Sequence, residues 1–599
     1  MREALTKAAA NGNTEKDFIY FNLLDLSEAG RTITLVTDLP SLSSNLIIDG
    51  STQPGNKIGI SNAKIILKTF RSKISLNLFS GKNIEQVEFY SLYFLDTTNP
   101  CISDPDGATR ITIKIDNSKN IVIGDQNRGN VFNGYKYSVL DISNTDGLVL
   151  ADNFFGQSSY AFQSICSGGI TLLNVTNIVI GGINKTNTII SGLTINYTDI
   201  QTIKKINITN NFIGIYSDGI TTDHSFDGSY ITIQGQVKNL TDRKPIVDML
   251  FKDNLMTHYS GAGGIVLSLL DGTINSKHNW FGIDKSGTVA LNLKRAHAGD
   301  GTAINLFAVD AEVVIGDEDP DEGNKIAYTY IGILNYNSAK VKILRNSFKC
   351  IGRQEYLLNG SMVLPSIKIT QNTSSYIKGT TTAGAIVDIF ASDDCINCSP
   401  ETFIGTTITS TFGEWQYPLT KTYNRSLIAI AHIGKQSSNF TKPVINAVKV
   451  EVTDYDCNQK GKISGIEINN TDKIKWVDEK GEIVSTEIDL KNVLPGKYKL
   501  IIGEYCTTES EFFTVQDLTP QIYSSFAIIT QPECGKSNGS VVNLYTYSAN
   551  NSPLTYSWLN QDLKQVGQSK DIRNLPAGSY ILKVSSQNCT TNYGPVILK

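Results

Sequence analysis

The sequence has little charge, and neither sign is in excess. Charged residues make up 18% of the 599 positions, below the ~25% of an ordinary soluble domain. With 53 basic and 57 acidic residues the formal net charge is −4. Bulk charge therefore predicts no nucleic-acid partner and no anionic membrane surface. Hydrophobic residues reach 40%, which is enough for a core and excludes global disorder.

Long apolar runs are also missing. The sequence contains no unbroken apolar run of the roughly 18 residues that a membrane span needs, so it predicts no membrane insertion. Residues 1–5 lack the apolar segment of a secretory signal. The chain is nevertheless rich in Ser, Thr and Asn, as extracellular proteins are. We therefore expect a secreted or cell-surface protein whose signal and sorting segments lie outside this sequence.

Short β-branched runs dominate what is present. After a helix-prone stretch at residues 1–10, runs such as 32–36, 46–48 and 111–115 alternate with Gly, Asn or Asp. Such runs favour strands, and the residues between them permit tight corners. Few helix-length periodic segments separate them, so βαβ units are disfavoured.

Two motifs recur along the first two thirds of the chain. The segment 120–124 (NIVIG) returns at 177–181 and, altered, at 312–316. A second segment, 148–156 (LVLADNFFG), returns at 206–214. The asparagines that close the second motif and its fragments are Asn153, Asn211, Asn254, Asn279 and Asn346. Repetition of this kind indicates one structural unit wound many times.

The repeats predict a parallel β-solenoid. A coil of ~20–25 residues cannot bury its apolar face alone, whereas coils stacked ~4.8 Å apart bury a continuous core. Alternate Ile, Val and Leu side chains would point inward, and stacked asparagines would bond from coil to coil. The helix at residues 1–10 would cap the first coil, which otherwise leaves an exposed sheet edge.

The N-terminal motifs also resemble a known family. Residues 2–5 (REAL), 48–55 (IDGSTQPG) and 279–288 (NWFGIDKSGT) are similar to right-handed parallel β-helix proteins with a Leu-Arg-Glu-Ala signature. The resemblance implies a right-handed β-helix over residues 1–355. The sequence departs from the family at the third unit, where an acidic corner replaces a Gly-rich one.

The last third predicts three β-sandwich modules. Strand-like runs with Gly or Asp turns predict the first at 364–447, which resembles bacterial immunoglobulin-like (Ig-like) domains. The modules 450–516 and 524–599 repeat each other, with matching Cys, Trp, Leu-Pro, Tyr and Cys positions. They resemble the Cys-flanked repeats of Bacteroidetes cell-surface proteins, including gliding-motility adhesins. That resemblance implies disulfides Cys457–Cys506 and Cys534–Cys589, which would join the first strand of each module to its last.

The remaining cysteines include a C-x-x-C pair, Cys395 and Cys398. Zinc needs two more ligands, and the motif has no second pair or paired histidines nearby. Redox chemistry would need a thioredoxin-like βαβ context. A structural loop disulfide between the two is the favoured interpretation. The sequence assigns no role to Cys101, Cys166 or Cys350.

The sequence gives no catalytic residues. β-Helix hydrolases of the polygalacturonase type use Asn-Thr-Asp, Asp-Asp and His-Gly motifs on neighbouring coils. Residues 144–147 (NTDG) fall where a coil should turn, and Asp393-Asp394 lies in the predicted sandwich. None of the five histidines precedes a glycine.

One acidic corner and four tyrosines are the candidate ligand sites. Asp317, Asp319, Asp321 and Glu322 have a calcium-loop-like spacing, but the loop glycine comes one position late. A solvated acidic corner is the favoured interpretation, and bound Ca²⁺ is the alternative. The aromatic candidates for a glycan-binding face are Tyr135, Tyr137, Tyr328 and Tyr330. Tyrosine on an outer strand face is more often a strand former.

These features predict a non-catalytic, elongated surface or secreted protein with an adhesive or structural role. Its partner would be a glycan or another cell-surface molecule on the solenoid face. The family context implies export by type IX secretion machinery, although a C-terminal sorting domain is not seen in this sequence. The alternatives are a polysaccharide lyase or glycoside hydrolase with accessory modules, and a trimeric phage-like spike.

Overall fold

The computed structural model divides the chain into two compact units. Unit 1 contains residues 1–369, 378–417 and 427–442, and unit 2 contains residues 370–377, 418–426 and 443–599. The structure describes the whole chain except residues 70–76, 97–110, 161–166, 223–229, 258–262, 292–300, 422, 424, 448, 469–472 and 588. Among the described residues, no helix combines the length and the apolar character needed to cross a bilayer.

Unit 1 is built mainly from three long parallel sheets of 11, 11 and 10 strands. The first contains β1 (Asp17–Tyr20), β3 (Leu46–Asp49), β6 (Glu85–Tyr90), β9 (Lys119–Ile123), β12 (Asp146–Leu150), β15 (Thr176–Gly181), β18 (Lys204–Thr209), β21 (Ile246–Lys252), β24 (Asp271–Lys277), β27 (Glu312–Gly316) and β30 (Val341–Leu344). The second contains β2 (Thr32–Leu35), β4 (Ile65–Thr69), β7 (Leu92–Asp96), β10 (Val131–Asn133), β13 (Phe154–Phe155), β16 (Thr188–Ile189), β19 (Phe212–Ile213), β22 (Leu255–Met256), β25 (Trp280–Phe281), β28 (Lys325–Ala327) and β31 (Ser347–Lys349). The third contains β5 (Asn77–Lys82), β8 (Ile111–Asp116), β11 (Tyr135–Ser143), β14 (Ser167–Leu173), β17 (Leu193–Tyr197), β20 (Ile231–Gly235), β23 (Ile265–Ser268), β26 (Thr302–Phe307), β29 (Ile331–Tyr336) and β32 (Gln354–Asn359).

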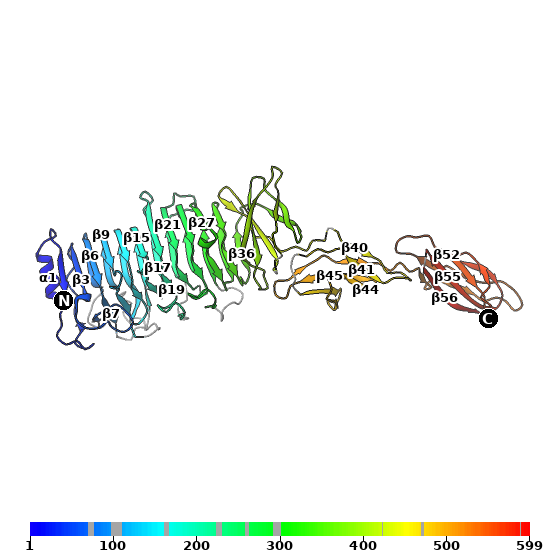
Figure 1. The fold of residues 1–599 in the computed structure, drawn as a ribbon, viewed down its shortest axis with the longest axis horizontal. Helices are drawn as coiled ribbons and strands as arrows, with labels where there is room; N and C mark the ends of the chain where they lie inside the picture. The colour runs from blue at the N-terminus through cyan, green and yellow to red at the C-terminus, as the bar shows by residue number, and fades with distance from the viewer. Residues whose placement is uncertain are drawn as a thin grey trace. The chain divides into compact units, whose positions relative to one another are not determined.

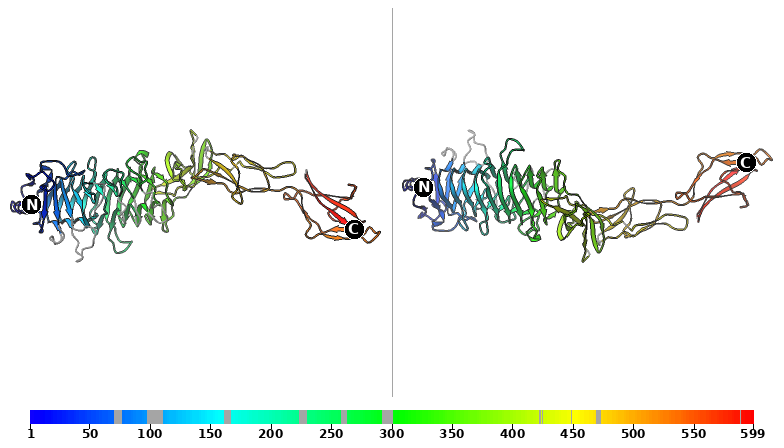
Figure 2. Two further views of the ribbon diagram at one scale, coloured as in Figure 1. Left: turned by 90° about the horizontal axis from the view of Figure 1, so that it is seen from below. Right: turned by 90° about the horizontal axis from the view of Figure 1, so that it is seen from above.

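The chain visits the three sheets in turn, so the all-β fold is a solenoid as predicted (Figures 1 and 2). In the first sheet the inward side chains stack in register from coil to coil: Leu148, Ile178, Ile206, Met249, Ile274 and Val313. Each is at most 2% exposed. The two recurring motifs occupy equivalent places, because β9, β12, β15 and β18 are neighbours in this sheet.

A buried asparagine ladder follows the first sheet. Its members are Asn130, Asn153, Asn187, Asn211, Asn254, Asn279, Asn324 and Asn346, all at most 2% exposed. The Asn130 oxygen accepts the Leu92 N–H. From Asn153 onward, each side-chain oxygen accepts the backbone N–H of the ladder asparagine one coil earlier; Asn254 does so from Asn211 at 3.0 Å. The Asn254 amide in turn donates to Ile208 O at 2.8 Å and to Asn279 Oδ1 at 2.9 Å. The ladder therefore satisfies buried backbone groups where the chain leaves the strands.

Both ends of the solenoid are covered. Helix α1 (Arg2–Ala10) packs Leu5 and Ala8 into the core at the first coil, confirming the predicted cap (Figure 1). The part of the following module that belongs to unit 1 covers the last coils. Ser437 Oγ accepts the Ile343 N–H at 2.9 Å, and Phe440 packs edge-on against Phe348. This contact protects the open edge of the final coil.

The modules after the solenoid consist of small antiparallel sheets. The first has β33 (Ile367–Asn372), β34 (Tyr376–Thr381) and β37 (Glu414–Pro418), and β36 (Pro400–Ile408), β35 (Ile386–Ser392), β38 (Leu427–Ile433) and β39 (Gln436–Ser437). The second has β40 (Glu451–Thr453), β41 (Gly461–Ser464) and β44 (Leu490–Val493), and β43 (Ile483–Ser485), β42 (Ile474–Asp478), β45 (Gly496–Ile502), β46 (Thr508–Glu509) and β47 (Phe513–Val515). The third has β48 (Gln521–Tyr523) and β51 (Tyr545–Tyr547), β49 (Ile528–Thr530), β50 (Gly539–Val542) and β54 (Ile572–Leu575), and β53 (Gln565–Gly567), β52 (Thr555–Leu559), β55 (Gly578–Ser586) and β56 (Cys589–Leu598). The second and third each bury a tryptophan, Trp476 and Trp558, in a separate core.

The ladder gives the first testable prediction. Asn254→Ala removes acceptors for Asn211 and donors to Ile208 and Asn279, and it leaves buried polar groups without partners. We expect the free energy of unfolding to fall by about 3 kcal/mol, measured by urea denaturation. Asn275→Ala, at an exposed position of β24, is the matched control and should change stability little. Equal effects of the two substitutions would contradict the structural role of the ladder.

Two carboxyl groups should make the stability of the fold depend on pH in opposite directions. Burial raises the pKa of Asp152 to about 6, although Asn62 and two backbone N–H groups donate to it. Its contribution to stability is therefore greatest when it is protonated and is lost as pH rises through about 6. Hydrogen bonds from Asn144 and Lys82 lower the pKa of Asp116 to about 2, so its contribution is lost as pH falls towards that value.

The second prediction compares these two positions. Asp152→Asn should become more stable relative to the wild type as pH rises from 4 to 7, because the amide keeps the acceptor and carries no charge. Asp116→Asn should be less stable than the wild type at pH 7, with the difference shrinking towards pH 2. Urea midpoints across this pH range measure both. If the stability difference from the wild type changed with pH in the same way for both variants, the opposite pKa shifts of Asp152 and Asp116 would be refuted.

Candidate functional site

The outer surface of the second sheet carries a row of large apolar side chains. In the two-residue strands β19 and β25 the first residue is partly exposed and the second enters the core, as with Trp280 and the fully buried Phe281. In β22 both Leu255 and Met256 are buried. Phe212, Leu255, Trp280 and Lys325 are paired in register on four successive coils. The Lys325 Nζ lies 4.3 Å from the centre of the Trp280 ring, within cation–π range.

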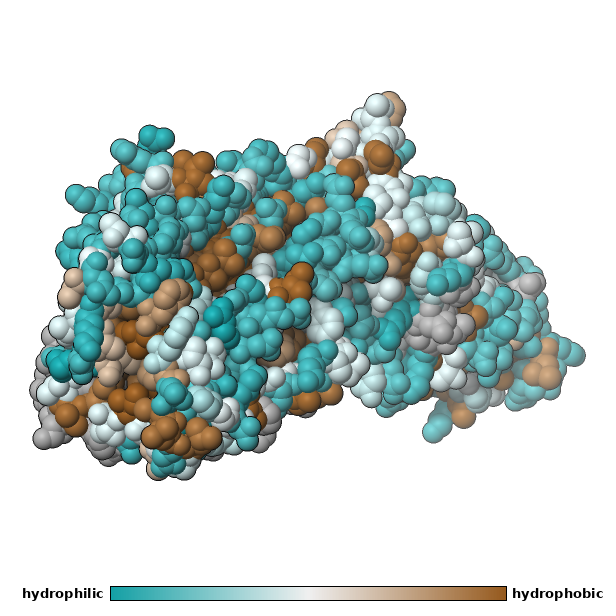
Figure 3. All heavy atoms as spheres, turned by 60° about the vertical axis from the view of Figure 1, so that its left-hand side comes forward, coloured by the Kyte–Doolittle hydropathy of each residue, from teal (hydrophilic) through white to brown (hydrophobic). Residues whose placement is uncertain are grey.

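Trp280 is supported from the side by the loop that follows its own strand. Gly287 in that loop has φ +74°, and a Cβ there would lie 3.3 Å from Trp280 Cζ3. The loop therefore approaches the ring as closely as a glycine allows. On the face drawn in Figure 3, hydrophobic residues form separate patches among hydrophilic ones.

Polar corner residues lie beside this apolar row. Asn210, Asp253 and His278 each precede a ladder asparagine and have φ values of 56°, 58° and 50°. This left-handed conformation turns the chain from the first sheet into the second. His278 Nδ1 lies 2.5 Å from Asp253 Oδ1, and both side chains are partly exposed.

Together these residues line an open groove of about 270 Å³, here called the aromatic groove. Its lining residues are Asn210, Phe212, Asp253, Asn254, Leu255, His278, Trp280 and Lys285. Lys285 comes from the 283–290 loop, and its N–H donates to Gly219 O of the 215–222 loop at 3.1 Å. Each of these loops is closed by its own antiparallel bridge, Ile283 to Ala290 and Ile215 to Thr222. The groove thus combines apolar rings, a carboxylate, an imidazole and a lysine.

The predicted acidic corner lies on a neighbouring coil and is paired with lysines. Lys277 Nζ contacts Asp317 at 2.9 Å, and Lys252 Nζ contacts Glu322 at 2.6 Å. These lysines lower the pKa of both carboxyl groups. Asp319 instead caps the short 3₁₀ turn at Pro320–Glu322 by accepting the Asp321 N–H. Two of the four predicted calcium ligands are therefore neutralised by cations of the protein, which favours the acidic-corner interpretation.

The predicted tyrosines do not mark the aromatic groove. Tyr328 and Tyr330 are partly buried at the corner after β28, where Tyr328 has φ +54°. The side chains of Tyr135 and Tyr137 lie outside the described residues. Trp280 and His278 line the groove and were not among the predicted ligand residues. A signal for them existed, because the recurring motif contains apolar residues directly after its asparagine.

The NTDG segment was predicted to be a coil turn, and only its first half is one. Asn144 and Thr145 form the corner between β11 and β12, whereas Asp146 and Gly147 begin β12. Asn144 and Gly147 have φ values of 47° and 86°. Asp146 accepts hydrogen bonds from Thr176 Oγ1 and Asn177 Nδ2, each at 2.6 Å. The other candidate carboxylate, Asp393, is buried in the module that covers the last coils.

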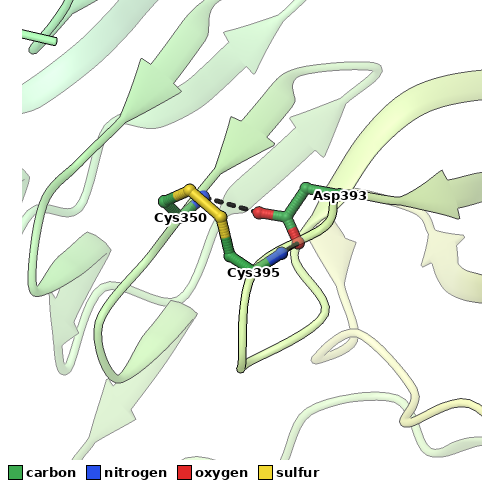
Figure 4. A group of neighbouring side chains, drawn as sticks. All are labelled: Cys350, Asp393 and Cys395. Carbon is green, nitrogen blue, oxygen red and sulfur yellow. Dashed lines mark hydrogen bonds between the residues drawn. A yellow bond between two sulfur atoms is a disulfide. The ribbon is translucent and has the colours of Figure 1, made fainter. Parts of the chain in front are cut away.

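The C-x-x-C prediction is wrong in its pairing. Cys395 forms a disulfide with Cys350, with the Cα atoms 5.1 Å apart. Cys398 is also disulfide-bonded, and its N–H donates to Cys395 O in a tight turn. Asp393 accepts the N–H groups of Cys350 at 2.6 Å and of Cys395 at 3.2 Å (Figure 4). Burial raises the pKa of this carboxyl group. The cluster joins the module to the last coils, and its disulfide leaves no thiolate on Cys350 or Cys395 to bind a metal.

The two module disulfides are also paired differently from the prediction. Cys457 bonds Cys589 of the next module, with the Cα atoms 5.2 Å apart. Cys506 is disulfide-bonded but not to Cys457, and Cys534 is free and exposed. Spacing alone could not decide this, because four cysteines allow three connectivities.

Comparisons with known proteins do not assign this chain to a family. The sequence matches no family model and no curated protein. Among solved structures, Geobacillus virus E2 ORF18 is 10% identical over 78% of each chain, with a TM-score of 0.22. The surface layer protein SbsC, domains 1–6, is 13% identical over 40% of this chain and 41% of that structure, with a TM-score of 0.12. Scores this low carry no argument about fold or function.

Proposed function

We propose that this chain is a non-catalytic surface or secreted protein that binds a glycan chain in the aromatic groove. The observation that carries the proposal is the in-register row Phe212, Leu255 and Trp280 beside Asp253 and His278. Sugar rings have apolar faces that pack on aromatic rings, and hydroxyl edges that bond to carboxylate, imidazole and ammonium groups. Convergence of an apolar floor with a few polar groups is typical of ligand sites.

The spacing of the row supports an extended ligand. Neighbouring coils lie ~4.8 Å apart, which is close to the length of one sugar residue in a polysaccharide. Phe212, Leu255 and Trp280 would therefore face successive residues of one chain that runs along the solenoid. The groove is open, which suits a polymer better than a small enclosed ligand.

The setting of this function is an oxidising compartment. Cys350–Cys395 and Cys457–Cys589 are disulfides, and stable disulfides are typical of exported proteins. We infer a right-handed winding, because parallel crossover connections are almost always right-handed. The three modules would serve as Ig-like and adhesin-type spacers, and export by a type IX route belongs to the same proposal.

The third prediction tests the aromatic groove. Trp280→Ala should weaken binding at least tenfold, about 1.4 kcal/mol, because the stacking surface is lost. Trp280→Phe should retain most of the affinity. Phe412→Ala, which removes an 89% exposed ring in the first module, is the control and should bind normally. The probes are xylan, cellohexaose and polygalacturonate, compared by calorimetry; equal binding by all variants would locate the site elsewhere.

His278 and Asp253 favour one second candidate, a polysaccharide-cleaving enzyme. An imidazole held 2.5 Å from a carboxylate has the geometry of a general base with its orienting group. The pair lies in the groove, where a bound glycan would pass. Within the part of the chain that the structure describes, the groove lining contains no further acidic residue to protonate a leaving group, which is why binding without cleavage is the leading proposal.

The fourth prediction separates the two candidates. On the binding proposal, the wild-type chain releases no reducing ends from the three probes, and His278→Ala still binds them. On the enzyme candidate, the wild type releases reducing ends or unsaturated sugars, and His278→Ala loses this activity while Trp280→Ala loses both binding and release. Two measurements distinguish these outcomes. A reducing-sugar assay detects released chain ends, and absorbance at about 235 nm detects unsaturated uronates.

A further inference from the structure

The two C-terminal modules are copies of one design, which makes their cysteines comparable. Trp476 donates its indole N–H to Ile488 O at 3.3 Å, and Trp558 donates to Ser569 O at 3.1 Å. In the same way Tyr498 donates to Leu494 O at 2.8 Å, and Tyr580 donates to Pro576 O at 2.9 Å. The strand pairs agree as well, with Trp476 opposite Leu500 and Trp558 opposite Leu582.

Each module has one cysteine in a turn and one in a hairpin. Cys457 lies in a turn closed by the Asp456 N–H and Gln459 O, and Cys534 lies in a turn closed by the Lys536 N–H and Glu533 O. In both places the bonded residues are the one before the cysteine and the second one after it, but the donor is the earlier residue at Cys457 and the later residue at Cys534. The hairpin cysteines follow matching strands: Cys506 comes after β45, and Cys589 comes after β55.

The observed disulfide joins the turn of one module to the hairpin of the next. Cys457 bonds Cys589 across 132 residues of sequence, and the Cys457 N–H also points at the Cys589 sulfur at 2.8 Å. Cys506 is bonded, but not to the turn cysteine of its own module. The turn cysteine of one module thus forms a disulfide with the hairpin cysteine of the module that follows it in sequence.

We propose that Cys534 has the same role as Cys457, and that it forms a disulfide with the hairpin cysteine of another module of this type. Cys534 is exposed and free, and its equivalent Cys457 shows which partner the position takes. The partner is therefore a thiol at the position of Cys506 or Cys589 in another module. Both S–H bonds break and one S–S bond forms, and the two electrons and two protons pass to a disulfide oxidant such as glutathione disulfide.

The test gives Cys534 a free hairpin thiol on a second molecule. The donor is the wild-type chain, in which Cys457 and Cys589 are joined. The acceptor is the full chain with C457S and C534S, which leaves Cys589 free. The control acceptor carries C457S, C534S and C589S together with K480C, which places a thiol at an exposed turn.

In a glutathione redox buffer we expect a donor–acceptor adduct joined through Cys534 and Cys589, identified by peptide mass spectrometry. It should form at least tenfold faster than the adduct with the control acceptor. Tryptophan fluorescence of each variant checks that Trp476 and Trp558 stay in folded cores.

Three results would overturn the proposal. One is an adduct that forms no faster than with the K480C acceptor. Another is a wild-type chain whose peptide map shows Cys534 joined to Cys589 within its own module. The third is a donor that forms only symmetric Cys534–Cys534 dimers in the presence of the free hairpin thiol.

Discussion

The solenoid depends on a fixed register between coils, and the buried asparagine ladder is the interaction that fixes it. A shift of one residue in any strand would expose its apolar side chains, because side chains alternate between the two faces. Hydrophobic contact alone resists such a shift but does not define which residue faces which. The ladder does, because each Asn oxygen must meet one particular N–H, as Asn279 meets that of Asn254. A single misplaced coil would leave several buried polar groups unpaired.

This register also produces the aromatic groove. Because Asn254 and Asn279 are aligned, the residues before them, Asp253 and His278, are aligned outside the core. The residues after them, Leu255 and Trp280, are aligned on the neighbouring sheet. A polar row and an apolar row therefore run side by side along the solenoid. The site is a consequence of the repeat, with its chemistry set by which residues flank each asparagine.

Much of the fold was predictable because it follows from local periodicity. The alternation in 120–124 and 177–181 indicates inward Ile and Val side chains, and Ile121 and Ile178 are fully buried or nearly so. The capping role of residues 1–10 was predictable from the exposed edge of a first coil. The aromatic groove was not predicted: the sequence pointed to Tyr328 and Tyr330, whereas Phe212 and Trp280 are among the residues that line the groove. Exposure of an aromatic ring depends on the loop beside it, as Gly287 shows for Trp280, and single-residue patterns do not encode that.

The cysteines show a different kind of limit. Matching positions in the two modules correctly indicated a repeated design, yet the same matching suggested bonds within each module. A repeat constrains equivalence between Cys457 and Cys534, but it does not say whether a bond closes inside the unit or on its neighbour. The same ambiguity holds for Cys350, whose bond to Cys395 joins the last coils to the module that covers them. In both places the disulfide joins a module to the part of the chain beside it: Cys350 of the last coils to Cys395, and Cys457 of one module to Cys589 of the next. The two bonds span 45 and 132 residues of sequence, so each restricts the unfolded chain over a long loop and thereby stabilises the folded state.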